Sequence, residues 1–237
     1  MTGAMSSDPR RAPSLAEAAR DAPPVPVDPV GRVIVSDACV AEGADWLARA
    51  EPRFARALEL TGTLPLRRAP DGFDQLLAAI LGQQVSVASA RAIRGRLEAA
   101  GMTTPEAILS VDEAHLRTLG LSRQKAAYAR ALAEARIDFA ALRGAPTDEV
   151  IATLTRVKGI GIWTAEIYAM FSLGRADVFA PGDLALQEGA RHLFELDARP
   201  TERVLRGMAE AWSPWRSVAA RALWAYYRVA KNREGIA

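Results

Sequence analysis

The chain has 237 residues, of which 50% are hydrophobic and 24% are charged. This composition is typical of a globular protein, and the length allows one large domain or two small lobes around a sizeable core. A formal net charge of +2 excludes a uniformly basic surface, so any basic patch must be local. Cys39 is the only cysteine, which excludes an internal disulfide and a cysteine-ligated zinc or iron–sulfur site. Without a secretory h-region or a membrane-length apolar run, we expect a cytoplasmic protein.

Residues 1–30 are rich in Pro, Ala, Asp and Arg, and they predict an extended, flexible tail. After this tail the pattern is helical, because Ala, Leu and Arg dominate and alternating β-branched runs are nearly absent. The spacing and the turn residues predict helices over residues 43–60, 72–99, 104–109, 112–118, 122–135, 147–155, 162–172, 183–194, 201–211 and 215–231.

These elements predict an all-α fold in a single domain over residues 31–237. No internal repeat stands out, which argues against a solenoid. We expect two lobes, the first built from residues 31–71 and 174–237, and the second from residues 72–173.

The segment from Leu154 to Gln187 carries the most information, and it begins with Gly159-Ile160-Gly161 between two predicted helices. The two glycines permit unusual backbone angles and let a phosphate approach closely. The helix that follows presents free N–H groups and its positive dipole end to such an anion, with the Thr164 hydroxyl in its first turn. A tight turn is the ordinary explanation for Gly-x-Gly alone. The flanking Thr-x-Val-x and Trp-Thr-Ala instead favour a helix-hairpin-helix clamp for DNA.

Asp183 follows Pro181-Gly182 and starts a predicted amphipathic helix. Taken alone, it is best interpreted as a helix N-cap. The nearby Asp177 is interpreted as a structural residue that orients the same loop.

Four separate blocks resemble the helix-hairpin-helix superfamily of DNA glycosylases, and within it the 3-methyladenine DNA glycosylase II branch. They are residues 79–86, the hairpin 155–165, residues 177–183 and the Trp-Ser-Pro-Trp-Arg-Ser block at 212–217. The similarity spans roughly residues 72–228. It implies a mostly helical fold with the active site in the cleft between two lobes, and repair of alkylated bases.

The resemblance implies that Asp183 is the catalytic carboxylate. Cleavage of an N-glycosidic bond builds positive charge on the sugar, which an ionised carboxylate beside C1′ stabilises. Whether Asp183 also activates the attacking water stays open. An alkylated purine already carries positive charge and leaves without a proton donor, so the lack of an obvious second acid fits this chemistry.

The resemblance also implies an aromatic base pocket containing Trp163 and Trp224. A tyrosine of the family pocket appears here as Ile167, with Tyr168 adjacent. Bifunctional relatives carry a Schiff-base lysine at the position of Trp163, and tryptophan has no such amine, so we expect no lyase activity. Trp212 and Trp215 are expected in the core.

For DNA contacts, the resemblance points to Gln84 as the wedge that fills the space of a flipped nucleotide, beside Val85 and Ser86. Gln83 is expected to satisfy backbone groups at this helix junction. Arg156 and Lys158, beside Gly159 and Gly161, are candidate phosphate contacts. Arg123 and Lys125 are equally well explained as a solvated helix face.

Family members also bind a monovalent cation at the hairpin through main-chain carbonyls, and the matching positions here are Thr155, Val157 and Ile160. No other cofactor is expected. The implied partner is double-stranded DNA with damaged bases, bound by a monomer in the bacterial cytoplasm. Two alternatives stay open: a glycosylase for uracil or deaminated bases, and a non-catalytic helix-hairpin-helix protein that only binds DNA.

Overall fold

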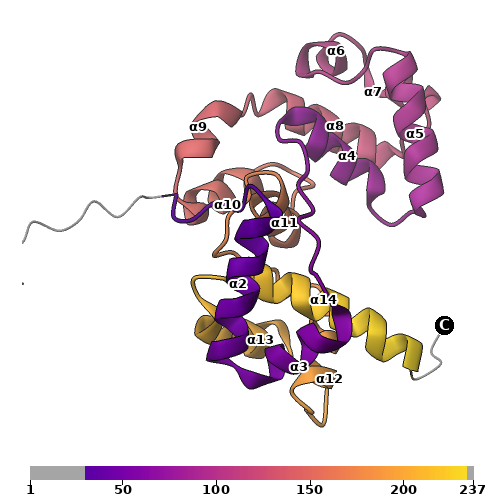
Figure 1. Ribbon diagram of the computed structural model, residues 1–237. Coiled ribbons are helices and arrows are strands. Elements are labelled where there is room, and N and C mark those ends of the chain that lie inside the picture. Colours follow the sequence, from indigo (N-terminus) through magenta and orange to yellow (C-terminus); the bar gives the residue numbers. More distant parts are fainter. Residues whose placement is uncertain (1–29, 234–237) are drawn as a thin grey trace, which may run out of the picture.

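The computed structural model describes residues 30–233, and the expected tail at 1–30 falls almost entirely outside them. Within the described range the chain forms helices and no strand, with one isolated antiparallel bridge between Val33 and Arg175. The expected all-α class is therefore confirmed. Figure 1 shows two groups of helices joined through α10 and α11.

The lower group in Figure 1 combines the beginning and the end of the described chain. Helices α2 and α3 pack on each other and on α14, which also packs on α12 and the short turn η1. The elements of this group are α2 (Asp37–Ala50), α3 (Pro52–Thr61), α12 (Leu184–Leu193), α13 (Glu202–Ala209), η1 (Glu210–Trp212) and α14 (Arg216–Arg233).

The upper group comes from the middle of the chain, and its helices surround α8. Its elements are α4 (Phe73–Gly82), α5 (Val87–Ala99), α6 (Pro105–Leu109), α7 (Glu113–Thr118), α8 (Arg123–Glu134) and α9 (Phe139–Gly144). Helices α10 (Thr147–Thr155) and α11 (Ile162–Phe171) pack on each other between the two groups.

The structure corrects three expected elements. The helix expected at 43–60 is two helices, because Pro52 cannot continue α2 and instead begins α3 at its first turn. The helix expected at 72–99 breaks at residues 83–86, where the pattern already indicated a turn. Helix α9, capped by Asp138, was not predicted from the sequence.

Most helix starts follow local capping chemistry that the sequence displays. A Ser, Thr or Asp side chain accepts a hydrogen bond from a backbone N–H in the first turn of its helix. Residues with this role are Ser86, Thr104, Asp112, Ser122, Asp138, Asp183 and Thr201. The caps at Thr104, Asp112, Ser122, Asp183 and Thr201 explain why these five helices start within a residue or two of the predicted positions.

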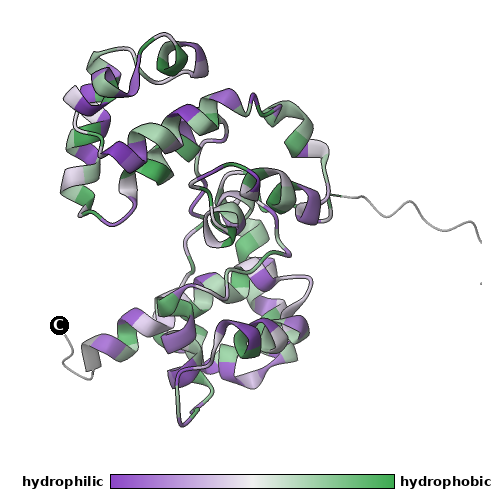
Figure 2. Ribbon diagram, turned by 180° about the vertical axis from the view of Figure 1, so that it is seen from behind, coloured by the Kyte–Doolittle hydropathy of each residue, from purple (hydrophilic) through white to green (hydrophobic). Residues whose placement is uncertain are grey.

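The core of the lower group is partly aromatic. Trp212 lies edge-on to Phe54 with ring centroids 5.3 Å apart and stacks on Phe194, and both Trp212 and Trp215 are buried. The expected core role of these two tryptophans is therefore confirmed. In Figure 2, hydrophobic residues lie on the helix faces turned toward neighbouring helices.

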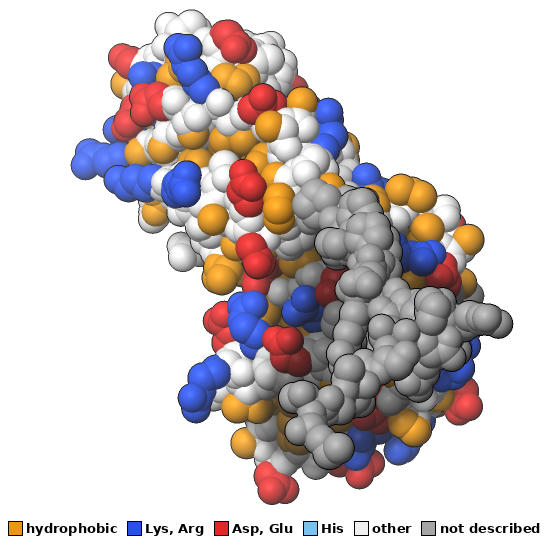
Figure 3. Space-filling view, turned by 90° about the vertical axis from the view of Figure 1, so that its left-hand side faces the viewer, with side chains coloured by type: hydrophobic (Ala, Val, Ile, Leu, Met, Phe, Trp, Pro, Cys, Tyr) orange, Lys and Arg blue, Asp and Glu red, His pale blue; other side chains and the backbone are white. Residues whose placement is uncertain are grey.

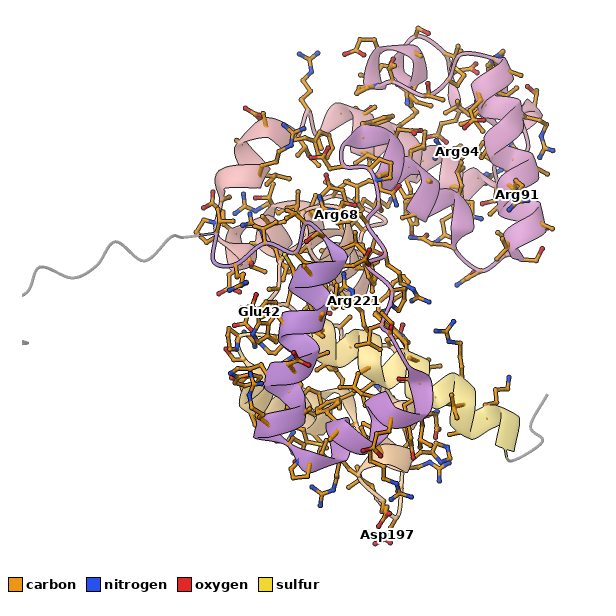
Figure 4. All side chains as sticks on the ribbon, in the orientation of Figure 1. Glu42, Arg68, Arg91, Arg94, Asp197 and Arg221 are labelled. Atoms are coloured by element: carbon orange, nitrogen blue, oxygen red, sulfur yellow. The ribbon has the colours of Figure 1, made fainter. Side chains whose placement is uncertain are left out.

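Two close contacts set the positions of the site residues described below. A Cβ on Gly189 of α12 would lie 2.7 Å from the Leu223 carbonyl of α14, so only glycine lets these helices approach so closely. The buried Arg221 donates to the Leu66 carbonyl in the segment between α3 and α4 and lies over the Phe171 ring of α11. Figure 4 shows Arg221 and Arg68 at the junction of the two groups. Among the described helices, none is long and apolar enough to cross a membrane.

Candidate active site and nucleic-acid interface

Asp183 is the N-cap of α12, and its carboxylate accepts four hydrogen bonds. Its Oδ1 accepts from the backbone N–H groups of Ala185 and Leu186, at 2.9 and 3.1 Å. The same oxygen accepts from Trp224 Nε1, and Oδ2 accepts from Trp163 Nε1, each at 3.1 Å. Donors and the helix dipole therefore favour negative charge here, and they fix the direction of the carboxylate.

The turn that carries Asp183 is itself held in place. The Asp183 N–H donates to the Ala180 carbonyl, and the Gln187 amide donates to the Pro181 carbonyl over 2.8 Å. Upstream, Asp177 accepts from Ser213 Oγ and from Arg216. This contact joins the loop before the catalytic candidate to the start of α14, which is the structural role expected for Asp177.

A cavity of about 590 Å³ opens beside Trp163, between the segment that precedes α4 and one face of α11. The α11 residues Trp163, Ile167 and Phe171 recur at intervals of four, so they line the cavity from one side of the helix. The remaining lining residues are Arg67, Arg68, Ala69, Gln75, Leu76, Ala79, Gly82, Gln83, Thr164, Tyr168 and Ser172. A mostly apolar wall with a few polar groups suits a flat, partly polar ligand such as a base.

The two indole rings differ in their surroundings. Trp163 is 45% exposed, which leaves a large part of its ring open. Trp224 is half-buried, with its ring centroid 5.7 Å from that of Phe171 and the Arg67 guanidinium 5.9 Å away. The structure thus brings Trp163, Trp224 and Asp183 together from three helices, and of these three Trp163 lines the cavity.

Tyr168 and Thr164 are buried residues of α11 that also line the cavity. Tyr168 is buried, its hydroxyl accepts from the Gly72 N–H at 2.8 Å, and burial raises the pKa of Tyr168 to about 12. Thr164, expected to contact DNA from the first turn of α11, is buried and lines the cavity. Its side chain therefore faces the expected base pocket, away from the surface that would contact phosphates.

The lining residues that sequence reasoning missed include Arg67, Arg68, Gln75 and Phe171. The interval of four from Trp163 through Ile167 to Phe171 was a signal for the last of these. Nothing in the local pattern marks Arg67 and Arg68, because they reach the cavity from an irregular segment whose path depends on both helix groups.

Of the two glycines in the hairpin between α10 and α11, only Gly159 has a backbone conformation that favours glycine. Gly159 has φ +96°, and a Cβ there would lie 2.3 Å from the Tyr128 ring. Gly161 has φ −86° and ψ 170°, which any residue adopts, and nothing lies within 4 Å of its Cβ position. Gly161 therefore makes no use of the backbone freedom that glycine permits, although its openness allows close approach by a ligand.

A second hollow, of about 690 Å³, brings the hairpin beside the expected wedge. Gln84 and Val85 lie on one side, and Gly159, Ile160 and Gly161 on another. Ser122, the N-cap of α8, also lines it, so the N-termini of α8 and α11 open toward the same space. The positive dipole ends of two helices that face one hollow suit an anion such as phosphate.

The wedge candidates are exposed in this loop. Gln84 is exposed and adopts φ +55°, a left-handed conformation unusual outside glycine. Val85 and Ser86 are also exposed, and Ser86 caps α5. The neighbouring Gln83 donates to the Gly159 carbonyl over 2.9 Å, so it joins the loop to the hairpin.

The basic residues near this hollow have different roles. Arg156 and Lys158 are exposed at the hairpin. Lys125 is buried, its Nζ donates to the Leu81 carbonyl at the end of α4, and burial lowers its pKa. The solvated-face interpretation of Lys125 was therefore wrong. In Figure 3, acidic and basic side chains are interspersed over the face shown, with a small basic group at one side of the upper lobe.

The cation candidates are main-chain carbonyls in the same hairpin. The Val157 carbonyl accepts from the Ile160 N–H over 3.0 Å, which closes the turn and still leaves a second lone pair on the oxygen. The Gly159 carbonyl accepts from Gln83, and Thr155, Val157 and Ile160 remain the candidate ligands that the resemblance implies. Within residues 30–233, no cluster of His, Cys, Asp and Glu is arranged to hold a metal ion.

Comparison with known proteins defines the class. Residues 77–215 match the model of the HhH-GPD superfamily of base excision DNA repair proteins, and the chain belongs to this family. This confirms the resemblance inferred from the four sequence blocks.

The individual proteins that are similar to this chain are named as 3-methyladenine DNA glycosylases or glycosidases. The chain is 30% identical to DNA-3-methyladenine glycosylase 1 of Schizosaccharomyces pombe, over 75% of this chain and 83% of that protein. It is 31% identical to DNA-3-methyladenine glycosylase 2 of Escherichia coli, over 65% of this chain and 57% of that protein. The structure of the DNA-3-methyladenine glycosidase of Bacillus halodurans superimposes with TM-score 0.73 and 36% identity, covering 81% and 91% of the two chains. The S. pombe Mag1 structure in complex with abasic DNA gives TM-score 0.66 and 30% identity, with coverages of 77% and 95%.

Proposed function

We propose that this protein is a monofunctional DNA glycosylase that removes alkylated purines from double-stranded DNA by hydrolysis of the N-glycosidic bond. The observation that carries the proposal is the hydrogen bonding of the Asp183 carboxylate by the indoles of Trp163 and Trp224. These hydrogen bonds place the negative charge of Asp183 beside two aromatic rings, whose faces are suited to bind a cationic base.

The mechanism follows from these positions. The flipped nucleotide places its base in the cavity against Trp163, while Gln84 fills the space left in the duplex. As the bond to the base lengthens, positive charge grows on the sugar, and Asp183 stabilises it electrostatically. The alkylated base leaves as a neutral molecule, because it was already cationic. Water then adds to C1′ of the sugar and loses a proton, which leaves an abasic site.

DNA is held by the hairpin side of the molecule in this proposal. The N-terminus of α11, with Gly161 and Lys158, grips one phosphate, and the carbonyls of Thr155, Val157 and Ile160 would hold a monovalent cation, whose positive charge would attract the DNA backbone. The S. pombe Mag1 protein has been solved in complex with abasic DNA, which supports DNA binding as the function of this side of the proposal. We further propose that the protein acts as a monomer in the bacterial cytoplasm.

Strand cleavage by a Schiff-base route is not part of the proposed activity. The three lysines of the sequence are Lys125, Lys158 and Lys231. Lys125 is buried against a carbonyl, Lys158 lies on the hairpin surface, and Lys231 lies near the end of α14. Trp163, which has no nucleophilic amine, occupies the position that a lyase would need for its lysine.

The decisive experiment measures base release from duplexes that each carry a single lesion. We expect release of 3-methyladenine and 7-methylguanine, an intact abasic strand, and no protein–DNA adduct trapped by borohydride. Asp183→Asn should reduce the rate by at least about 10²-fold with DNA affinity nearly unchanged, because it removes charge and keeps shape. Release of uracil or hypoxanthine alone would favour the deaminated-base alternative. Tight binding without any base release would favour a DNA-binding protein without catalysis.

A further inference from the structure

Glu166 is a buried carboxylate that the proposed mechanism does not use. It lies on α11, three residues after Trp163, and it is only 1% exposed. Its Oε1 accepts from Arg206 of α13 over 3.0 Å, whereas its Oε2 is buried without a hydrogen-bond partner. A buried carboxylate with one unsatisfied oxygen is costly, so a purely structural reason for keeping it is weak.

The ion pair continues toward Asp183. Arg206 also donates to Glu202 Oε1 over 3.1 Å, within the same helix. The other carboxylate oxygen of Glu202, Oε2, lies 3.4 Å from the position that a Cβ on Gly182 would occupy. Gly182 immediately precedes Asp183. The chain of contacts therefore runs from α11, through α13, to the turn that presents the catalytic candidate.

Trp163 and Asp183 are thus connected twice. Directly, the indole N–H donates to the carboxylate at 3.1 Å. Indirectly, Glu166 holds α11 to Arg206, and Glu202 lies against the turn before Asp183. This second connection adds to the direct hydrogen bond in holding α11 beside the turn that carries Asp183.

We propose that Glu166 is a positioning residue for base excision, which acts through Arg206 and Glu202 to hold Trp163 and Asp183 in their productive relation. This inference rests on the proposed glycosylase function. The ionised form of Glu166 attracts Arg206 most strongly, so the network is tightest when Glu166 is charged. The charged groups that face it, Arg206 and Glu202, are both on α13.

Burial raises the pKa of Glu166 to about 7, with Arg206 acting in the opposite direction. Glu166 therefore loses its charge as the pH falls through neutrality, and the network loosens over the same range. A misplacement of the reacting groups by a fraction of an ångström is enough to slow the chemical step. We expect the excision rate to decrease between pH 8 and pH 6 for this reason.

The test is single-turnover excision of 7-methylguanine with enzyme in excess, between pH 5.5 and 8.5, for wild type and Glu166→Gln. Glutamine keeps the shape and the acceptor for Arg206 and removes the charge. We expect the wild-type rate to fall about tenfold from pH 8 to pH 6, and the variant to be flat at the lower level. DNA affinity should stay within about twofold, since the hairpin is untouched. Glu98→Gln, which removes an ion pair with Arg94 on α5, is the matched control and should keep the wild-type profile.

Two further measurements keep the inference falsifiable. Arg206→Lys retains a positive charge and should recover part of the activity that Arg206→Ala loses, whereas a simple packing role predicts equal losses. A Glu166→Gln enzyme with the wild-type rate and pH profile would overturn the inference while leaving the proposed function intact. Failure of the wild type itself to release 7-methylguanine would instead overturn the proposed function.

Discussion

Trp163 donates its indole N–H to Oδ2 of Asp183 across 3.1 Å, although the two residues lie 20 positions apart on different helices. The residue expected to stack on the base therefore also orients the carboxylate expected to stabilise the sugar. Base recognition and bond cleavage therefore depend on the same hydrogen bond. The effects of substitutions at these two positions on the excision rate should for this reason not be additive.

Two substitutions of Trp163 should separate its roles. Trp163→Phe keeps an aromatic face and loses the hydrogen bond, and we expect a loss of about tenfold to a hundredfold in excision rate on every lesion, since a hydrogen bond to a charged group contributes roughly 1.5–3 kcal/mol. Trp163→Ala also loses the stacking face, so the loss should be greater for cationic 3-methyladenine than for neutral hypoxanthine. Single-turnover rates on both lesions measure this. Equal losses for Trp163→Ala on the two bases would show that the ring packs the fold and does not recognise charge.

The two hairpin glycines should respond differently to alanine. Gly161→Ala meets open space and an ordinary backbone conformation, so the melting temperature should stay within about 2 °C. If a phosphate approaches here, DNA affinity should drop several-fold and the salt slope should fall by about 0.9 for the lost contact.

Gly159→Ala is the matched comparison. Its Cβ would collide with Tyr128, and its φ is +96°, so we expect a destabilisation of about 1–3 kcal/mol. Thermal melts and binding titrations at several salt concentrations distinguish the two variants. Unchanged affinity of a folded Gly161→Ala protein would remove this turn from the DNA interface.

Arg67 should oppose binding of positively charged bases. Its guanidinium lies 5.9 Å from the Trp224 ring centroid and lines the cavity beside Trp163, and its backbone has φ +49°. Removal of this charge in Arg67→Ala should raise excision of 3-methyladenine relative to hypoxanthine by about threefold to tenfold, as expected for roughly 1 kcal/mol of repulsion. Arg56→Ala, which removes an exposed arginine that does not line the cavity, is the control. A uniform loss on both bases with a smaller salt slope would indicate that Arg67 contacts a phosphate instead.

Stability should depend on pH through Glu166. Its pKa rises from 4.5 in the unfolded chain to about 7 in the folded protein, because burial disfavours the charged form. The folded state therefore binds the proton more tightly, and the free energy of unfolding should fall as pH rises from 4.5 to 7 and then level off.

Glu166→Gln has no proton to lose, so it should be more stable than wild type at pH 8 by up to about 3 kcal/mol, and nearly equal to it at pH 4.5. Urea unfolding at both pH values tests this, with Glu98→Gln as the control. A difference that is independent of pH would show that Glu166 does not titrate in this range.

Several features of this protein were readable from the sequence because they depend on neighbouring residues. The helix starts at Ser86, Thr104, Asp112 and Thr201 follow from side chains that cap their own first turn. The Gly-x-Gly hairpin and the Pro-Gly-Asp turn are local motifs, and together with the Trp-Ser-Pro-Trp-Arg-Ser block they indicated the family. Pro52 also marked a helix boundary, and this local signal was overlooked.

Other features were decided only by tertiary structure. Local sequence explained Asp183 as an N-cap, and that role is present, yet its two indole donors arrive from α11 and α14. The burial of Lys125 against the end of α4, the approach of Arg67 to Trp224 and the pairing of Glu166 with Arg206 likewise join distant segments. Capping and turn formation are short-range interactions that a few residues determine. Burial, charge pairing and cavity shape depend on which helix faces meet, and here that was set by contacts such as Gly189 against Leu223.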